Sequence, residues 1–190
     1  PVEGDISPEA PTPNRIEQYI AFVQKADKRQ LLIDLIEGQM VACGIVFTRT
    51  KHGANRLAKQ LSKVGIPSDS IHGDKSQTAR TRALNAFRNG DVFILVATDI
   101  ASRGIDVEDI THVFNFDLPN EPEVYIHRIG RTARAGRDGL AYSFCDETES
   151  GYLVGIQRLL GEEIEVLEDQ PYHFETVSYT HLRAHETSKH

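Results

Sequence analysis

The sequence predicts an α/β fold, namely one parallel sheet with helices on both of its faces. Its 190 residues are enough for a single domain with a sizeable core and too few for two. Short apolar runs typical of strands alternate along the chain with longer segments whose apolar residues recur at helical spacing. Because strict alternation of strands and helices favours parallel strands covered by the intervening helices, these observations together indicate the fold class.

The two ends of the chain are not expected to join this fold. Residues 1–13 contain four prolines among small and acidic residues, a composition typical of a linker, so residues 1–14 are interpreted as the remnant of an interdomain linker. From Ser178 onward the composition changes abruptly, with three histidines in the last thirteen residues. Residues 178–190 are therefore expected to be a non-native tail. The domain itself is placed at residues 15–177.

Six strands and five helices are expected between these ends. The run Ile94-Leu95-Val96 is typical of a buried strand, whereas Leu57, Leu61 and Val64 follow helical spacing. In a parallel sheet of this kind, ligands bind in the loops beyond the carboxyl ends of the strands. The strands are expected at residues 16–23, 44–48, 70–73, 92–97, 112–116 and 140–144, and the helices at residues 28–37, 52–64, 77–89, 123–130 and 149–160.

The net charge of −7 argues at first against a nucleic-acid partner, but the charge is unevenly distributed. Residues 25–145 carry a net charge of +3, whereas residues 146–177 carry −8. Within the mildly basic middle, arginines recur every third residue, a density that suits a polyanion or a fixed network of acidic partners; a solvated helix face is the alternative. These arginines are Arg128, Arg131, Arg134 and Arg137.

Composition also bears on compartment and metal binding. No run approaches the roughly 18 apolar residues that a membrane span needs, and no leader pattern precedes the domain, so a cytoplasmic protein without membrane contact is expected. Cys43 and Cys145 lie in apolar runs, where cysteine behaves as a small buried hydrophobe in a reducing compartment. His181 and His185 have a metal-capable spacing but lack the glutamate of H-E-x-x-H, so no metal site is expected.

Two segments that follow expected strands offer groups for binding phosphate. Thr50 comes after a strand and just before a helix, where a hydroxyl is suited to hold a phosphate oxygen. In the next segment, Gly73 exposes backbone where another chain can approach, and Arg80 projects from the first turn of a helix toward the same edge. A tight turn followed by a capped helix would explain Gly73, but it would not readily explain why Gly73 and Arg80 occur together.

A third segment, residues 97–106, joins a buried strand to a loop rich in donors and small residues. Thr98 and the backbone of Gly104 are placed to contact phosphates, and the carboxylate of Asp106 can accept hydrogen bonds from sugar hydroxyls. In a fourth segment, residues 125–137, Arg131 and Arg134 stand three apart, so both can point one way from a single helical turn. Two permanently charged guanidiniums suit the negative charge that develops on a transferred γ-phosphoryl group.

These four segments resemble motifs IV, IVa, V and VI of the DEAD-box RNA helicases, in the same order and at similar spacing. The resemblance covers residues 16 to 175 and implies a RecA-like fold, that of the helicase C-terminal lobe. The stretches Lys25-Ala26-Asp27-Lys28 and Gln157-Arg158-Leu159-Leu160 are similar to the bacterial RhlE branch of the family. Ala133 departs from the family, in which many members have glycine. Because alanine is small and a good helix former, little loss is expected there.

The resemblance also implies a role for each matching residue. Asp106 matches the residue near the ATP ribose, and Arg131 and Arg134 match the catalytic arginine fingers. Arg103 matches a position that contacts acidic groups across the cleft between the two lobes, while His127 and Arg128 match positions that tie the lobes together. The positions that hold the phosphates of single-stranded RNA in the family are matched by Thr50, Gly73, Arg80, Thr98 and Gly104.

Two sequence elements that ATP hydrolysis requires are absent from this chain. It has neither G-x-x-x-x-G-K-[ST] nor Asp-Glu-Ala-Asp, so nothing in it cradles the β-phosphate, holds Mg²⁺ or positions the attacking water. In the family a preceding N-terminal lobe supplies these parts, and closure on ATP and RNA pries apart a short duplex. The fragment alone is therefore expected to be inactive, with RNA, ATP with Mg²⁺ and that lobe as its partners.

Other interpretations remain open at this point. A stand-alone RNA-binding or adaptor module without ATPase activity is the main alternative, and a related helicase acting on DNA is another. A purely structural domain gives no reason for Arg131 and Arg134 to share one face. At single positions, Arg137 is interpreted as a solvated loop charge, and His127 as either an interlobe contact or a satisfied interior histidine.

Overall fold

The structure, a computed structural model, describes residues 15–174. The expected linker at residues 1–14 and the expected tail at residues 178–190 lie outside this range. All six expected strands and all five expected helices are present, together with a short 3-10 helix, η1, and one further strand. The strands are β2 (Ile16–Phe22), β3 (Gly44–Phe47), β4 (Ser68–Ile71), β5 (Ile94–Ala97), β6 (His112–Asn115), β7 (Gly139–Cys145) and β8 (Glu165–Val166). The helices are η1 (Lys25–Asp27), α1 (Lys28–Gly38), α2 (Lys51–Lys63), α3 (Gln77–Asn89), α4 (Pro122–Ile129) and α5 (Ser150–Leu160).

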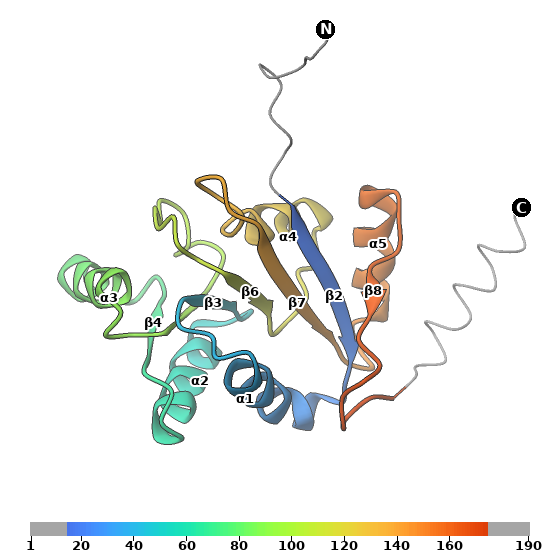
Figure 1. Cartoon of the computed structure of the whole chain (residues 1–190), viewed down its shortest axis with the longest axis horizontal. Helices are drawn as coiled ribbons and strands as arrows, with labels where there is room; N and C mark the ends of the chain where they lie inside the picture. The colour runs from blue at the N-terminus through green and yellow to red at the C-terminus, as the bar shows by residue number, and fades with distance from the viewer. Residues whose placement is uncertain (1–14, 175–190) are drawn as a thin grey trace, which may run out of the picture.

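The seven strands form one sheet in the order β4-β5-β3-β6-β7-β2-β8 (Figure 1), and every neighbouring pair is parallel. Helices pack on both faces. Apolar residues of α3, α4 and α5 join one core cluster, whereas those of α1 and α2 join a second cluster on the other face. The predicted parallel sheet with helices on both faces is therefore confirmed.

The central strands show why the sequence has continuous apolar runs. In β3, Ile45 and Phe47 belong to one core cluster while Val46, between them, belongs to the other. Successive side chains of a strand point to opposite faces, so a strand covered on both sides buries every residue. All four residues of β5 are likewise fully buried. The apolar runs thus identify the strands that lie inside the sheet.

Local signals set the limits of α3. The hydroxyl of Ser76 accepts a hydrogen bond from the backbone N–H of Ala79 at 3.1 Å and so caps the first turn. At the other end, Gly90 has a left-handed conformation with φ of 83°, which glycine adopts without strain. Together these caps give the helix the limits that its apolar spacing predicts.

The end of the described chain adds a strand that was not predicted. The acidic side chains at residues 162–169 are all exposed, whereas Ile164 lies in the core between them. Residues 165–166 form β8, which pairs with β2 through Tyr19↔Glu165 and Ile20↔Val166. This strand is only two residues long, too short for its sequence to carry a strand signal.

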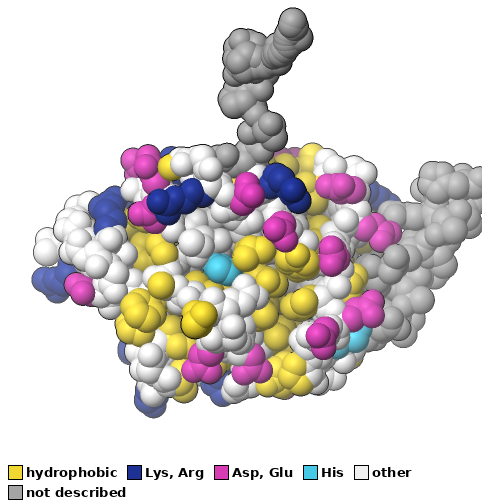
Figure 2. All heavy atoms as spheres, in the orientation of Figure 1, with side chains coloured by type: hydrophobic (Ala, Val, Ile, Leu, Met, Phe, Trp, Pro, Cys, Tyr) yellow, Lys and Arg dark blue, Asp and Glu magenta, His cyan; other side chains and the backbone are white. Residues whose placement is uncertain are grey.

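A row of stacked rings crosses β2, β7 and β6. Ring centroids lie 5.2 Å apart for Tyr19 and Tyr142, 5.8 Å for Tyr142 and Phe114, and 5.9 Å for Phe114 and His112. Gln39 bridges the row, because its Nε2 donates to the Tyr142 hydroxyl at 2.6 Å and its Oε1 lies 2.8 Å from His112 Nε2. Apolar side chains gather on this face (Figure 2), over strands that no helix covers in the same view of Figure 1.

Both cysteines are free thiols. Cys145 is buried in the core as expected, and burial raises the pKa of its thiol; Cys43 is half-buried, and burial raises its pKa to about 11. Within residues 15–174 no helix is long and apolar enough to cross a membrane. The same part of the chain holds no cluster of three or more histidine, cysteine, aspartate or glutamate side chains arranged for a metal ion.

Candidate functional site

The predicted site residues gather beyond the carboxyl ends of three adjacent strands. Thr50 follows β3, Gly73 follows β4 and Thr98 follows β5 directly. These strands lie side by side in the order β4-β5-β3, so the three segments meet at one edge of the sheet. The expectation that the site lies beyond the carboxyl ends of the strands agrees with this arrangement.

Thr50 caps the N-terminus of α2. Its Oγ1 accepts a hydrogen bond from the Gly53 N–H at 3.0 Å, and its carbonyl accepts one from the Thr48 hydroxyl at 3.1 Å. The Thr50 side chain is exposed, and its hydroxyl proton has no acceptor among the described residues. Thr50 can therefore donate to a phosphate oxygen at a helix N-terminus, where the backbone dipole also favours an anion.

Gly73 and Gly104 are glycines for different reasons. Gly104 has φ of 79°, a left-handed conformation that strains any residue with a side chain. Gly73 has no such conformation, and a methyl group built on it would meet no atom within 4 Å. Gly73 lies in a turn closed by a hydrogen bond from the Lys75 N–H to the His72 carbonyl at 3.1 Å, and Ser76 caps the helix that follows, so both parts of the tight-turn alternative are present. Neither the packing nor the backbone of this lobe requires a glycine there, whereas close approach of a ligand would.

Arg80 binds the backbone of the loop after β5 rather than standing free. Its Nη1 donates to the carbonyl of Ala101 at 2.6 Å, and its Nη2 donates to the carbonyl of Arg103 at 2.9 Å. The guanidinium is half-buried. Arg80 thus links α3 to the loop that carries Thr98 and Gly104.

Arg131 and Arg134 reach the other end of this loop. Arg131 Nη1 donates to the carbonyl of Ile105 at 3.2 Å, and Arg134 Nη2 lies 3.4 Å from Oδ1 of Asp106. The two arginines were expected to point the same way from a single helical turn. This reason was wrong, because α4 ends at Ile129, before both of them. They converge instead through the turns that follow the helix. Three predicted nucleotide-binding side chains therefore come together at one exposed place.

Arg128 is buried, with only 3% of its surface exposed. Its Nε and Nη2 donate to the two carboxylate oxygens of Asp99 at 2.6 and 2.9 Å. Its Nη1 donates to Asn115 Oδ1 at 3.1 Å and to the carbonyl of Asp117 at 2.6 Å, and the guanidinium lies over the Phe47 ring. Four hydrogen bonds inside this lobe occupy the guanidinium. A direct contact with another lobe stays a prediction, and here Arg128 anchors the loop after β5.

A hollow of about 310 Å³ lies between α4 and the loop after β5. The alternative that His127 is an interior histidine is wrong, because its side chain is exposed on this hollow. The three residues expected to meet another lobe, Arg103, His127 and Arg128, all line it, next to Arg131. The complete lining is Asp99, Ile100, Ser102, Arg103, Val124, His127, Arg128 and Arg131.

A buried charge network at the same edge of the sheet was not predicted. Lys28 is 1% exposed, and its Nζ lies 2.8 Å from Glu149 Oε1 and 3.3 Å from carboxylate oxygens of both Asp117 and Asp146. Arg49 joins the network, because its Nη2 donates to Glu149 Oε2 at 3.1 Å and its backbone N–H donates to Asp117 Oδ2 at 2.9 Å. The residue that precedes Thr50 is therefore held by two carboxylates.

Lys28 keeps its charge despite burial. Burial alone would lower the pKa of Lys28, but the surrounding carboxylates of Glu149, Asp117 and Asp146 outweigh it and raise the pKa. Asp117 and Asp146 follow the ends of β6 and β7, so the rule that selected Thr50 also points to them. The signal that could have found the network was charged residues directly after buried strands.

Comparison with known proteins agrees with this geometry. Residues 27–136 match the family described as the helicase conserved C-terminal domain, which is more than half of the chain. The chain belongs to that family. The helicase lobe is 44% identical over 157 residues to DEAD-box ATP-dependent RNA helicase CshA of Geobacillus kaustophilus, and 39% identical over 165 residues to ATP-dependent rRNA helicase rrp3 of Aspergillus terreus. These matches cover 83% and 87% of the chain but only 33% and 37% of the relatives. The lobe thus spans about a third of their length.

Solved structures give the same assignment. The crystal structure of Escherichia coli DEAD-box protein SrmB, bound to regulator of ribonuclease activity A, matches with a TM-score of 0.74 at 37% identity, covering 83% of this chain and 91% of the SrmB chain. Saccharomyces cerevisiae Dbp5 bound to RNA and ADP BeF3 matches with a TM-score of 0.72 at 32% identity, covering 92% and 45%. The predicted RecA-like C-terminal lobe of a DEAD-box helicase is confirmed, whereas the RhlE branch and the role of each site residue stay predictions.

Proposed function

We propose that the lobe forms the C-terminal half of an ATP-dependent RNA helicase. It binds the backbone of single-stranded RNA and supplies Arg131 and Arg134 to an ATP molecule held by an N-terminal lobe. ATP hydrolysis in the assembled protein is thereby coupled to local unwinding of an RNA duplex. The RNA contact is independent of sequence, since hydroxyls, backbone amides and cations recognise phosphate rather than bases. We place this activity in the cytoplasm.

One observation carries the proposal: the loop of residues 98–106 accepts hydrogen bonds both from a predicted RNA-binding arginine and from a predicted nucleotide-binding arginine. At one end Arg80, a predicted RNA-binding residue, binds the carbonyls of Ala101 and Arg103. At the other end Arg131 binds the carbonyl of Ile105. A shift of the loop that alters its hydrogen bonds to Arg80 therefore also alters its hydrogen bond to Arg131, and the reverse holds. This arrangement supports energetic coupling between RNA binding and nucleotide binding.

The residues present fit one side of a nucleotide. Asp106 has an exposed carboxylate able to accept from ribose hydroxyls, and Arg131 and Arg134 place two guanidiniums beside it. Bound ATP supplies the phosphoanhydride bond that is hydrolysed. The two arginines neutralise charge on its terminal phosphate, and the sequence has no phosphate-binding loop of the form G-x-x-x-x-G-K-[ST]. Mg²⁺ and the attacking water are assigned to the N-terminal lobe, and the lobe alone is proposed to be inactive.

The test is an ATPase assay, with and without single-stranded RNA, on three proteins. These are the lobe alone, the lobe fused behind the N-terminal lobe of a related DEAD-box helicase, and the fusion carrying Arg131→Ala. RNA-stimulated turnover is expected only in the intact fusion, and Arg131→Ala should reduce it at least about 100-fold. Arg137→Ala is the matched control and should leave turnover unchanged, because within residues 15–174 the Arg137 side chain forms an ion pair only with exposed Asp109, at 3.0 Å.

Unchanged turnover in the Arg131→Ala fusion would show that the arginine assignment is wrong. RNA binding by the lobe, together with a fusion that never hydrolyses ATP, would favour the stand-alone RNA-binding or adaptor alternative.

A further inference from the structure

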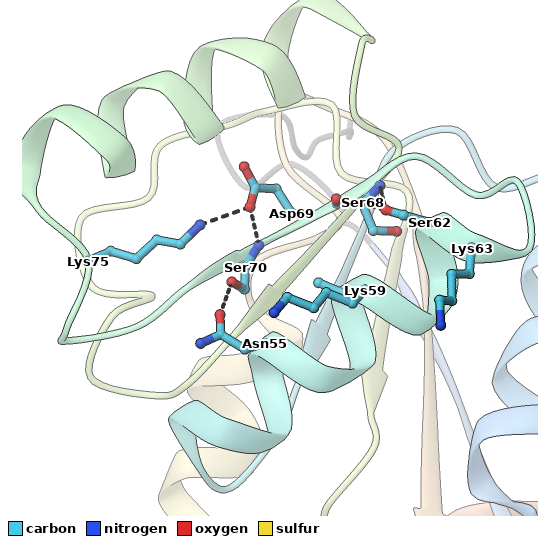
Figure 3. A pocket seen from close by; sticks show the side chains of 9 residues that line it. Asn55, Lys59, Ser62, Lys63, Ser68, Asp69, Ser70 and Lys75 are labelled. Atoms are coloured by element: carbon cyan, nitrogen blue, oxygen red, sulfur yellow. Dashed lines mark hydrogen bonds and ion pairs between the residues drawn. The ribbon is translucent and has the colours of Figure 1, made fainter.

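A second hollow lies beside the candidate site, between α2 and the edge strand β4 (Figure 3). It is an open groove of about 670 Å³. Three lysines, Lys59, Lys63 and Lys75, and one carboxylate, Asp69, line it together with Asn55 and small polar residues. We call this feature the α2–β4 groove. Its charged lining is net positive, although the whole chain is acidic.

The groove presents donors that have no acceptor among residues 15–174. Lys59 and Lys63 are exposed, and neither forms an ion pair or hydrogen bond with a described residue. Oδ1 of Asn55 already accepts from the Ser70 hydroxyl at 2.6 Å and faces His72 Nε2 at 3.0 Å, which leaves the Asn55 amide group to donate elsewhere. In Figure 3 the Lys59 side chain extends along the groove toward Asn55 and Ser70.

The acidic member of the lining is already neutralised. Asp69 Oδ1 accepts from Lys75 Nζ at 2.8 Å and from the backbone N–H of Ser70 at 2.8 Å (Figure 3). Asp69 therefore does not compete for Lys59 and Lys63. A ligand that fits the remaining groups must bring acceptors with negative charge.

The edge of β4 is closed to an added peptide strand. The Ser62 hydroxyl occupies both outward backbone groups of Ser68, accepting from its N–H at 3.3 Å and donating to its carbonyl at 3.2 Å. The N–H of Ser70 is taken by Asp69. Binding a peptide by strand addition requires these groups to be free, so this edge does not offer that mode.

The groove continues from the predicted RNA-binding edge. Lys51, Asn55, Lys59 and Lys63 recur every fourth residue and form one ridge along α2, which begins right after Thr50. Twelve residues of helix span about 18 Å. Asn55 also contacts His72, the neighbour of Gly73, so the end of the groove and the Gly73 turn belong to one hydrogen-bonded unit.

We propose that the α2–β4 groove binds the phosphates of the same RNA strand beyond the segment held at Thr50, Gly73 and Thr98. This inference rests on the proposed function and extends it. Regularly spaced phosphates match free lysines and an amide donor on one ridge, and such contacts need no base recognition. The groove thereby lengthens the RNA site of this lobe and makes its affinity depend on strand length.

Fluorescence anisotropy of the lobe with two labelled single-stranded RNAs, of about 6 and about 16 nucleotides, tests the inference. The variant is Lys59→Ala with Lys63→Ala, both on an exposed helix face where alanine favours folding. The control is Lys25→Ala with Arg29→Ala, which removes the same charge from exposed positions on η1 and α1.

The groove variant should bind the long RNA about tenfold more weakly, and the slope of log K against log salt should become shallower by about 1.4, or about 0.7 for each phosphate that is no longer neutralised. Binding of the short RNA should stay unchanged, and the control should match the wild type with both RNAs. Gly73→Val should weaken both RNAs, because it affects the site at the sheet edge.

Each other outcome has a definite meaning. If the short RNA binds and responds to Gly73→Val while the groove variant has no effect on the long RNA, the groove inference is overturned and the proposed function stands. Equal losses in the groove variant and the control also overturn it, since net charge alone then explains the effect. If polyglutamate binds in a Lys59- and Lys63-dependent way and the long RNA does not, the groove is a site for acidic peptides. No binding of either RNA would overturn both proposals.

Discussion

Ala133 has a left-handed backbone conformation, with φ of 59°. The sequence-based expectation of little loss at this position was wrong in its reason, because it treated Ala133 as part of a helix. Since α4 ends at Ile129, helix propensity is irrelevant four residues later. An L-amino acid in this conformation is strained by about 1–2 kcal/mol, whereas glycine is not. The strain lies between Arg131 and Arg134, in the turn that directs Arg131 to the Ile105 carbonyl and Arg134 to Asp106.

Ala133→Gly should therefore raise the free energy of unfolding by about 0.5–1 kcal/mol, because relief of the strain exceeds the extra freedom of glycine in the unfolded chain. Urea denaturation measures the change. Ala86→Gly, the same substitution in the middle of α3, is the control and should lower stability by about 1 kcal/mol. Equal losses in the two variants would show that the turn carries no such strain.

Single residues also show which parts of the site could be predicted from the sequence alone. The family resemblance grouped Asp106, Arg131 and Arg134 at one nucleotide site; in the structure Arg134 lies beside Asp106 and Arg131 donates to the carbonyl of the preceding residue, Ile105, while their role toward a nucleotide stays a prediction. The sequence could not indicate that Arg128 is buried on Asp99, since that contact depends on how α4 packs against the loop after β5. Partners brought together only by packing leave no periodic signal in the chain.

At the scale of elements, the Lys28 network joins α1 to the loops after β3, β6 and β7. Lys28 is the first residue of α1, and its three carboxylate partners come from the loops after β6 and β7. A buried charge that loses its partner leaves the others without compensation, which is strongly destabilising. The network therefore fixes how these segments meet at the edge of the sheet that holds the site.

Lys28→Met should lower the free energy of unfolding by about 3–5 kcal/mol, because three buried or partly buried carboxylates then lack their cation. Lys25→Met, on exposed η1, is the control and should change stability by less than about 0.5 kcal/mol. Urea titrations followed by circular dichroism report both values. A loss for Lys28→Met no larger than that of the control would mean that the carboxylates find compensation elsewhere.

Elements differ in how well sequence predicts them. Strands β3 and β5 are buried on both faces, so their apolar runs identify them directly. β8 has only two residues and depends on its pairing with β2 and on burial of Ile164, neither of which is visible in a window of sequence. The start of β4 was expected at residue 70 but lies at Ser68, since Ser68 and Asp69 are polar residues of an edge strand.

At the scale of the whole molecule, two histidines make stability depend on pH. Burial lowers the pKa of His72 from its ordinary value of 6.5, and the positive charge of Lys75 adds to this; burial also lowers the pKa of His112. The N–H of Asp74 donates to His72 Nδ1 at 3.2 Å, a bond that protonation of Nδ1 would remove. The unfolded chain therefore takes up protons at a higher pH than the folded lobe does.

The sign of the effect follows from proton linkage. Because the folded pKa values lie below 6.5, their contribution to stability is complete above about pH 6.5 and declines as the pH falls below it. Urea unfolding at about pH 7.5 and about pH 5.5 should show lower stability at the acidic pH, and His72→Gln should show a smaller difference. Exposed His52→Gln should behave like the wild type. An identical difference in His72→Gln and wild type would exclude His72 as a contributor.

The pairing of β2 has a consequence for how the lobe folds on the ribosome. Among the described strands β2 is synthesised first, but it lies between β7 and β8, with Ile16 opposite Gly139 and Tyr19 opposite Glu165. At about 5–20 residues per second, the ribosome needs roughly 6–24 s to reach β7 after completing β2. During that time strands β3 to β6 can associate, while the apolar face of β2 has no partner in this lobe. The lobe therefore completes its sheet only at the end of its own synthesis.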